Sequence, residues 1–160
     1  MPAVKIEKTK PMTIAYVEHV GEYGKLPFEE DMRTLYGWAK AKKVRPGLQA
    51  LGIYHDNPEM TPPERCRSEV AIPIYSRAPP EGGIKVRKLP AMTVAATSHE
   101  GPASEFRNTY SALNAWVEEH GYEWSGPSIE VYSKKPAVVG GQTILFARIK
   151  VPVRRRGKRA

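Results

Sequence analysis

The chain has 160 residues, of which 41% are hydrophobic and 26% are charged, and its formal net charge is +8. This length and apolar share suit one domain, or two small half-domains with a shared core, and exclude a disordered chain. No stretch approaches the roughly 18 apolar residues of a membrane span, and the first ten residues lack the apolar core of a signal peptide. The single cysteine, Cys66, excludes an internal disulfide, so we expect a cytoplasmic protein without membrane contact.

The positive charge is concentrated at the C-terminus. Five basic residues lie within 154–160, and the rest of the chain carries a net charge of only +3. A basic tail can bind nucleic-acid phosphates without reading their sequence. Such a tail is more often a frayed, solvated terminus that aids solubility, and we favour this interpretation over nucleic-acid binding.

The first half of the chain has the pattern of a strand, a helix and two further strands. Strand-like residues cover 3–9 and run on through 12–19, and a helix of about four turns begins near Pro27. Two strands follow, around 49–55 and 67–75. The apolar face of the helix recurs at helical spacing and consists of Phe28, Met32, Leu35, Tyr36 and Ala39.

The second half has the same order. A helix is expected from near Pro102 to Gly121. Its apolar face consists of Phe106, Tyr110, Leu113 and Val117. The strands of this half are expected at 84–89 running on through 92–99, at 128–133 and at 143–153.

The two halves also repeat each other in sequence. "MTIAYVEHVGE" at 12–22 resembles "MTVAATSHEGP" at 92–102, and after a two-residue slip the match continues at a spacing of 78 residues. The matched pairs include Phe28 and Phe106, Leu35 and Leu113, Trp38 and Trp116, Tyr54 and Tyr132, and Pro58 and Pro136. We infer a tandem duplication in a single domain over 1–160. Its parts are repeat one at about 3–75, a Pro- and Gly-rich linker at 76–83, repeat two at about 84–153 and the basic tail at 154–160.

A duplicated strand–helix–strand–strand unit predicts an α+β fold. One such unit could hardly bury enough surface alone, so we expect two units side by side, with an antiparallel sheet and both helices on one face. Residues that agree between the repeats are then explained by folding. Functional residues are sought where the repeats differ. Glu130 is matched to Gly52, Trp124 to Pro46, and Tyr110 to Met32.

These motifs resemble the GyrI-like family, also described as bacterial transcription activator effector-binding domains. The resemblance rests on "HEGPASEFRNTYSALNAWVEEHGY" at 99–122 and "SGPSIEVYSKKP" at 125–136, and on their counterparts in the first half. It implies a ligand cleft between the halves that binds small, often cationic or aromatic molecules with aromatic side chains and a buried Glu. Glu130 and Tyr132 stand at the E-x-Y of the family motif.

Members of this family include sensors fused to a DNA-binding domain, proteins that sequester toxins or inhibit gyrase, and hydrolases of strained electrophiles. The first repeat begins almost at residue 3, so we expect a stand-alone member rather than a direct transcription regulator.

The chemistry of Glu130 supports either binding or catalysis. A carboxylate in an aromatic cleft is destabilised by desolvation, so it stays neutral with a raised pKa or is neutralised by a cation. The aromatic residues expected around it are Tyr132, Tyr54, Tyr110, Trp116, Trp124 and Tyr16. A raised pKa would also suit Glu130 as a general base, with Tyr132 or Tyr54 as hydrogen-bond donor. Strand alternation alone allows the opposite arrangement, with Glu130 in solvent and its neighbours Ile129 and Val131 buried.

The leading hypothesis is therefore a small-molecule-binding protein that takes hydrophobic cationic or electrophilic ligands. A cofactor-free hydrolase is one alternative. The other is a protein that acts on a macromolecule, such as DNA gyrase or a regulator.

The remaining polar residues give weaker signals. The spacing of the four histidines does not predict a metal site, and no cofactor motif is visible. His19 and His99 are matched between the repeats and are interpreted as structural. Glu69 is a candidate second acid, but a surface ion pair with Arg65 or Arg67 is the more common arrangement.

Overall fold

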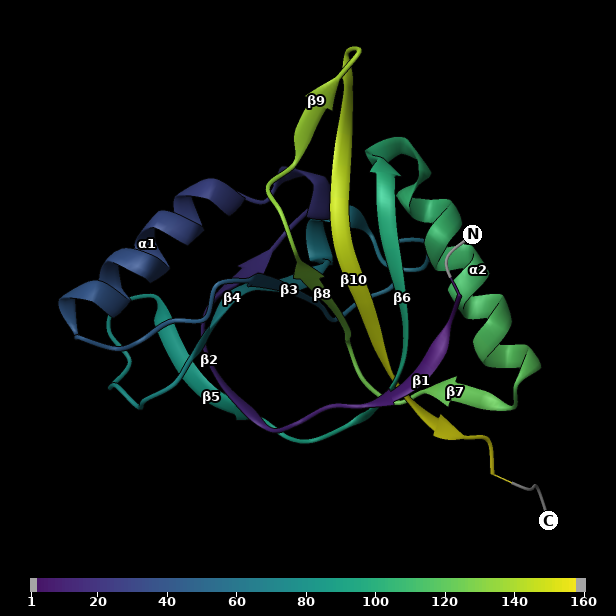
Figure 1. Ribbon diagram of the computed structural model, residues 1–160, viewed down its shortest axis with the longest axis horizontal. Coiled ribbons are helices and arrows are strands. Elements are labelled where there is room, and N and C mark those ends of the chain that lie inside the picture. Colours follow the sequence, from purple (N-terminus) through teal and green to yellow (C-terminus); the bar gives the residue numbers. More distant parts are fainter. Residues whose placement is uncertain (1–2, 158–160) are drawn as a thin grey trace. The chain divides into compact units, whose positions relative to one another are not determined.

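The computed structural model describes residues 3–157 and separates them into two compact units (Figure 1). One unit is formed by Lys10–Ala91, and the other by the residues up to Thr9 together with those from Met92 onward. Each unit combines antiparallel strands with one α-helix of 14 residues, which confirms the predicted α+β class. In the described part of the chain, no helix is long and apolar enough to cross a membrane.

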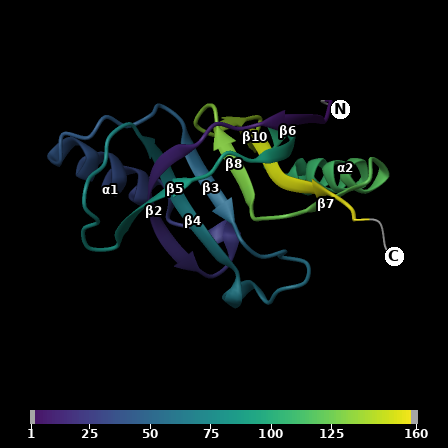
Figure 2. The ribbon, with the colours of Figure 1, turned by 90° about the horizontal axis from the view of Figure 1, so that it is seen from below.

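In the Lys10–Ala91 unit the strand order is β3-β4-β2-β5. The strands are β2 (Met12–Val20), β3 (Ala50–Tyr54), β4 (Arg67–Ile74) and β5 (Ile84–Leu89). The helices are α1 (Phe28–Ala41) and the short 3₁₀ turns η1 (Tyr23–Lys25) and η2 (Pro63–Arg65). Helix α1 lies against β2 and β4 (Figure 2), because its apolar stripe needs a buried surface.

In the other unit the order is β1-β6-β10-β8, and β7 and β9 each pair with part of β10. The strands are β1 (Lys5–Lys8), β6 (Thr93–Pro102), β7 (Tyr122–Trp124), β8 (Ser128–Tyr132), β9 (Ala137–Val139) and β10 (Gln142–Arg155). The helices are the 3₁₀ turn η3 (Ala103–Glu105) and α2 (Phe106–Glu119), which lies beside β6 and β7. β7 and β9 were not predicted, because each has only three residues.

The first strands of the two repeats are exchanged. β1 pairs with β6 of the second repeat, with Lys5 opposite Ala96, whereas β5 pairs with β2 of the first repeat, with Lys85 opposite Tyr16. The prediction that each of these strands runs on into the next was therefore wrong. A proline lies near each break, and proline cannot donate to a strand ladder, so the chain leaves the strands of one unit there and joins those of the other. The exact repeat boundaries stay a prediction.

The apolar stripes of both helices form the cores as predicted. Leu35 and Ala39 of α1 are completely buried among residues of β2 and β4, and Leu113 of α2 is completely buried against Ile149 and Val151 of β10. Helix α2 begins four residues later than expected, at Phe106, because β6 stays paired with β10 as far as Pro102.

The basic C-terminus is ordered over its first residues, so the prediction of a frayed tail from residue 154 was wrong there. β10 continues to Arg155, whose guanidinium lies over the ring of Tyr122 at 5.0 Å from the centroid. Arg156 donates a hydrogen bond to the Glu118 carbonyl at the end of α2, at 2.6 Å. Cations at this end of a helix are favourable, because the helix dipole places partial negative charge there. Residues 158–160 lie outside the described residues.

The packing of α2 predicts a large loss of stability for Leu113→Ala. Leu113 is 0% exposed, so its truncation should lower the free energy of unfolding by about 2–5 kcal/mol in urea denaturation. Leu48→Ala is the matched control, because Leu48 is 99% exposed and should change stability by less than about 0.5 kcal/mol. Similar losses in the two variants would contradict the assigned core.

Candidate functional site

Glu130 lies in the middle of β8 and faces the helix of its unit. Its register partner on β10 is Ile149, which packs in the core beneath α2. Side chains alternate along a strand, so Ser128, Glu130 and Tyr132 share this face. Glu130 is only 7% exposed. A carboxylate therefore lies between a sheet and a helix, where apolar residues are the rule.

Two hydroxyl groups contact this carboxylate, and a third is bonded to one of them. The Tyr110 hydroxyl, from α2, donates to Glu130 Oε2 at 2.6 Å, and the Tyr132 hydroxyl donates to Oε1 at 2.7 Å. The Ser128 Oγ is 2.5 Å from the Tyr110 oxygen. Each carboxylate oxygen thus has its own phenol donor, and one phenol is also bonded to a serine.

Burial raises the pKa of Glu130 to about 7, and the hydrogen bonds from Tyr110 and Tyr132 oppose this rise. Desolvation prevails because neutral phenol donors stabilise the carboxylate less than water or a cation would. Within residues 3–157, the hydrogen bonds of Glu130 come from uncharged groups. Near neutral pH both the neutral and the ionised form of Glu130 are therefore populated.

Strand alternation could not have placed Glu130, because both faces of β8 are covered. Ile129 is 6% exposed and Glu130 is 7% exposed, although they point to opposite sides. The alternation rule, which buries one face of a strand and exposes the other, therefore does not hold for Ile129 and Glu130. Ser128 was missed by the sequence analysis, although its position two residues before Glu130 places it on the same face.

The two tryptophans predicted at this site have other partners. Trp116 stacks on His120, with 3.9 Å between the ring centroids, and on Tyr122. Trp124 donates from its indole nitrogen to the Asn114 side chain at 3.0 Å. The Trp116 indole therefore packs at the C-terminal part of α2, and the Trp124 indole, from β7, binds the same helix. Their role in ligand binding stays a prediction.

Tyr16 and Tyr54 belong to the Lys10–Ala91 unit. Tyr16 lies beneath the Arg87 guanidinium, 4.4 Å from the ring centroid, and Tyr54 packs edge-on against Tyr23. The predicted ligand cleft, and the contribution of these two tyrosines to it, stay predictions.

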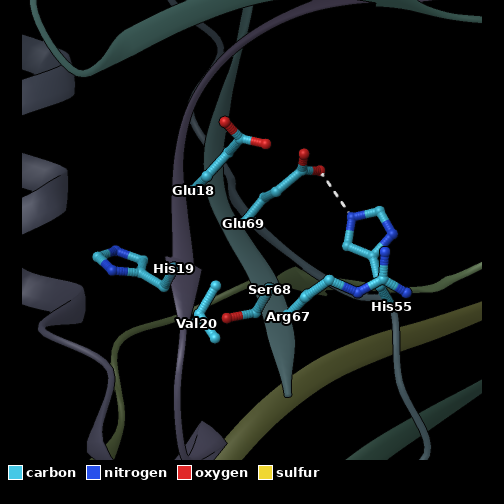
Figure 3. A pocket seen from close by; sticks show the side chains of 7 residues that line it. All are labelled: Glu18, His19, Val20, His55, Arg67, Ser68 and Glu69. Carbon is cyan, nitrogen blue, oxygen red and sulfur yellow. Dashed lines mark ion pairs between the residues drawn. The ribbon is translucent and has the colours of Figure 1, made fainter. Parts of the chain in front are cut away.

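A pocket of about 310 Å³ lies in the same unit and is lined by charged residues (Figure 3). Glu18 of β2 is directly opposite Glu69 of β4 in the register. Like charges in this position destabilise a sheet, so each acid needs a cation. Glu18 forms an ion pair with Lys85, and Glu69 with Arg87. The full lining consists of Glu18, His19, Val20, His55, Arg67, Ser68 and Glu69.

Glu69 is buried, so the surface pairing expected for it was wrong. Glu69 is 4% exposed and accepts two hydrogen bonds from the Arg87 guanidinium, at 2.5 and 2.7 Å. His55 Nε2 lies 3.3 Å from the same carboxylate (Figure 3). Arg67 instead binds Asp56. The sequence did not indicate the pairing with Arg87, because Arg87 lies on β5, which comes from beyond the linker.

The histidines matched between the repeats are held by nearby polar groups, as the structural interpretation expects. His19 Nε2 is 2.5 Å from an Asp31 carboxylate oxygen on α1, and His99 Nδ1 is 2.7 Å from the Thr109 hydroxyl on α2. In both units a histidine thus ties a strand to the helix. Within the described residues, no group of three or more His, Cys, Asp or Glu side chains could hold a metal ion.

The contrast between the two opposed acids predicts different costs of neutralisation. Glu69→Gln should lower the free energy of unfolding by about 1–3 kcal/mol, because Arg87 loses its counter-charge. The loss is smaller than for a fully buried pair, since the Arg87 side chain is 30% exposed. Glu18→Gln, in a pair that is about half exposed, should cost less than about 1 kcal/mol by the same urea denaturation. Equal costs would contradict the assignment of Glu69 as the structural acid.

The raised pKa of Glu130 predicts a specific dependence of stability on pH. Between pH 4.5 and about 7 the folded protein retains a proton on Glu130 that the unfolded chain has released, so stability falls as pH rises. The contribution should be about 2–4 kcal/mol across this window. Glu130→Gln should remove it, as measured by urea denaturation of both proteins at pH 5 and pH 8. Parallel pH profiles for the two proteins would overturn the assignment.

Sequence comparison matches residues 2–154 to the model of the GyrI-like small molecule binding domain. The prophage-derived protein YosT of Bacillus subtilis is 28% identical over 133 residues, which cover 82% of this chain and 89% of YosT. The testis-expressed protein 264 homolog of Mus musculus is 26% identical over 141 residues, and the match spans 76% of this chain but 41% of the mouse protein.

Solved structures share the fold at low sequence identity. The C-terminal domain of EcmrR has a TM-score of 0.74 at 18% identity, covering 97% of this chain and 99% of that domain. A hydrolase encoded by lin2189 of Listeria innocua has a TM-score of 0.70 at 13% identity, covering 94% and 91%. SAV2435, solved with tetraphenylphosphonium bound, has a TM-score of 0.57 at 10% identity, covering 95% and 94%. Because the family model matches nearly the whole chain, this protein belongs to the GyrI-like small-molecule-binding domain family.

Proposed function

We propose that this protein binds hydrophobic organic cations at Glu130. The observation that carries the proposal is a buried carboxylate whose hydrogen-bond donors are uncharged phenols. Such a group has lost the stabilisation of water without gaining a counter-charge. A cationic ligand supplies that charge, and its binding then stabilises the ionised form.

Aromatic rings near the carboxylate favour the same class of ligand. Tyr110 and Tyr132 each place a ring beside Glu130, and Phe106 lies 5.6 Å from the Tyr110 ring. A cation over the face of an aromatic ring gains about 0.5–2 kcal/mol, more when it is desolvated. The ligand class is therefore a hydrophobic cation, bound as an effector or as a xenobiotic. Tetraphenylphosphonium, which is bound in the structure of SAV2435, has this chemistry.

The proposal predicts that affinity for tetraphenylphosphonium depends on Glu130 and on pH. A cation binds the ionised carboxylate, so with a pKa of about 7 the affinity should rise about tenfold from pH 6 to pH 8. Isothermal titration calorimetry of the purified chain at both pH values measures this change.

Glu130→Gln should abolish both the binding and its pH dependence. Glu100→Gln is the control, because Glu100 lies on an exposed position of β6 in the same unit and should bind as the wild type does. Binding that is equal in all three proteins and at both pH values would refute Glu130 as the cation site.

Hydrolysis of electrophiles is a second candidate function, favoured by the same pKa. A carboxylate with a pKa of about 7 is suited to act as a general base at neutral pH. Glu130 would take a proton from water as the water oxygen attacks the electrophilic carbon and the strained ring bond at that carbon breaks. The departing atom would take the Tyr132 hydroxyl proton, which Tyr132 would regain from Glu130. Lin2189, which shares the fold, is described as a hydrolase.

Product analysis by mass spectrometry distinguishes the two functions. A strained electrophile such as an epoxide or an activated cyclopropane should be converted to its water adduct by the wild type and not by Glu130→Gln. If such compounds bind and none is converted, the hydrolase function is contradicted and the binding function is retained.

A further inference from the structure

We propose that Ser128 is a positioning residue that holds Tyr110 as a hydrogen-bond donor to Glu130 and thereby favours the charged carboxylate. This inference rests on the proposed cation site and names a residue that controls it. Ser128 does not need to touch the ligand. It acts through Tyr110, whose hydroxyl is bonded both to Ser128 at 2.5 Å and to Glu130 at 2.6 Å.

The direction of these bonds follows from the number of protons. A phenol has one proton to donate, and an ionised carboxylate can only accept. When Glu130 is charged, Tyr110 donates to its Oε2, so the bond between Ser128 and Tyr110 is donated by the serine hydroxyl. A phenol that accepts a hydrogen bond becomes a stronger donor, so Ser128 strengthens the bond that reaches Glu130.

A proton on Oε2 would reverse this chain. Glu130 would donate to Tyr110, and Tyr110 or Ser128 would then have to redirect its own proton to another acceptor. Ser128 is 3% exposed, so water cannot supply one easily. The proton is therefore better accommodated on Oε1, beside Tyr132, which is partly exposed. The two carboxylate oxygens therefore differ: Oε2 stays a hydrogen-bond acceptor, and Oε1 takes the proton.

Among residues 3–157, no charged side chain contributes to the pKa shift of Glu130. From α2 the titratable group at Glu130 is Tyr110, and on β8 it is Tyr132. On β10 the paired residue is Ile149, and its neighbour Arg148 points to the opposite face, where it binds Glu7 and Ser98. Burial therefore raises the pKa of Glu130, and the two tyrosines, with the serine bonded to one of them, oppose that rise.

The experiment compares the pH dependence of tetraphenylphosphonium binding in wild type and Ser128→Ala. We expect the midpoint of the pH profile to rise by about half a pH unit in the variant. At pH 6.5 the affinity should then fall about two- to threefold, and at pH 9, where Glu130 is ionised in both proteins, it should be unchanged. A loss of affinity that is equal at every pH indicates a structural role and overturns the proposal.

Tyr110→Phe tests whether the serine acts through the phenol. In a Tyr110→Phe background the further change Ser128→Ala should leave the pH profile where it was, because the link to Glu130 is already lost. A full additional shift in the double variant would overturn the proposal. Ser128→Cys, which keeps the size of the side chain but donates weakly, should give an intermediate midpoint and is the variant to use if Ser128→Ala does not fold.

A measurement without ligand separates this inference from the proposed function. The carboxyl ¹³C resonance of Glu130 can be titrated by NMR in wild type and in Ser128→Ala. A higher pKa in the variant supports the role of Ser128 even if tetraphenylphosphonium does not bind, in which case the proposed function alone fails for this probe. Identical titrations in the two proteins overturn the role of Ser128 even if the cation binds.

Discussion

The desolvation of one carboxylate constrains the unit that contains α2. Glu130 is buried between β8 and the helix, and it is stabilised there by the hydroxyls of Tyr110 and Tyr132. Neutral donors reduce the cost of burying a charge but do not remove it. The helix must therefore present Tyr110 to the strand. The pKa of the carboxyl group is about 7, so at neutral pH a small change in its surroundings alters its charge. That sensitivity is what a ligand-responsive group requires.

A second buried acid in the other unit shows the opposite solution. Glu69 is buried to a similar degree, but Arg87 binds both of its oxygens and His55 lies nearby. Its charge is balanced within the protein, so a cationic ligand would have to displace an arginine to reach it. Glu130 has no such competitor among the described residues. The difference between the two acids, more than their shared burial, supports the proposal that Glu130 is the acid that binds a ligand.

The sequence predicted the α+β class and both helices from local patterns, and comparison of the two repeats singled out Glu130. Leu35 and Leu113 recur at helical spacing and are buried as expected, and Glu130 differs from its counterpart Gly52. What could not be predicted depends on pairing between distant segments. The exchange of β1 and β5 and the pairing of Glu69 with Arg87 leave no local signal, since each partner is brought in by another strand.

The comparison of Glu130 with Gly52 also supports the proposal that the acid has a functional role. Gly52 pairs with Val70 as Glu130 pairs with Ile149, and both partners are core residues beneath a helix. The fold therefore accepts a residue without a side chain at this position. A buried carboxylate there brings a desolvation cost that folding does not require. A residue that the fold does not need, and that destabilises it without a counter-charge, supports the proposal that Glu130 binds a cationic ligand.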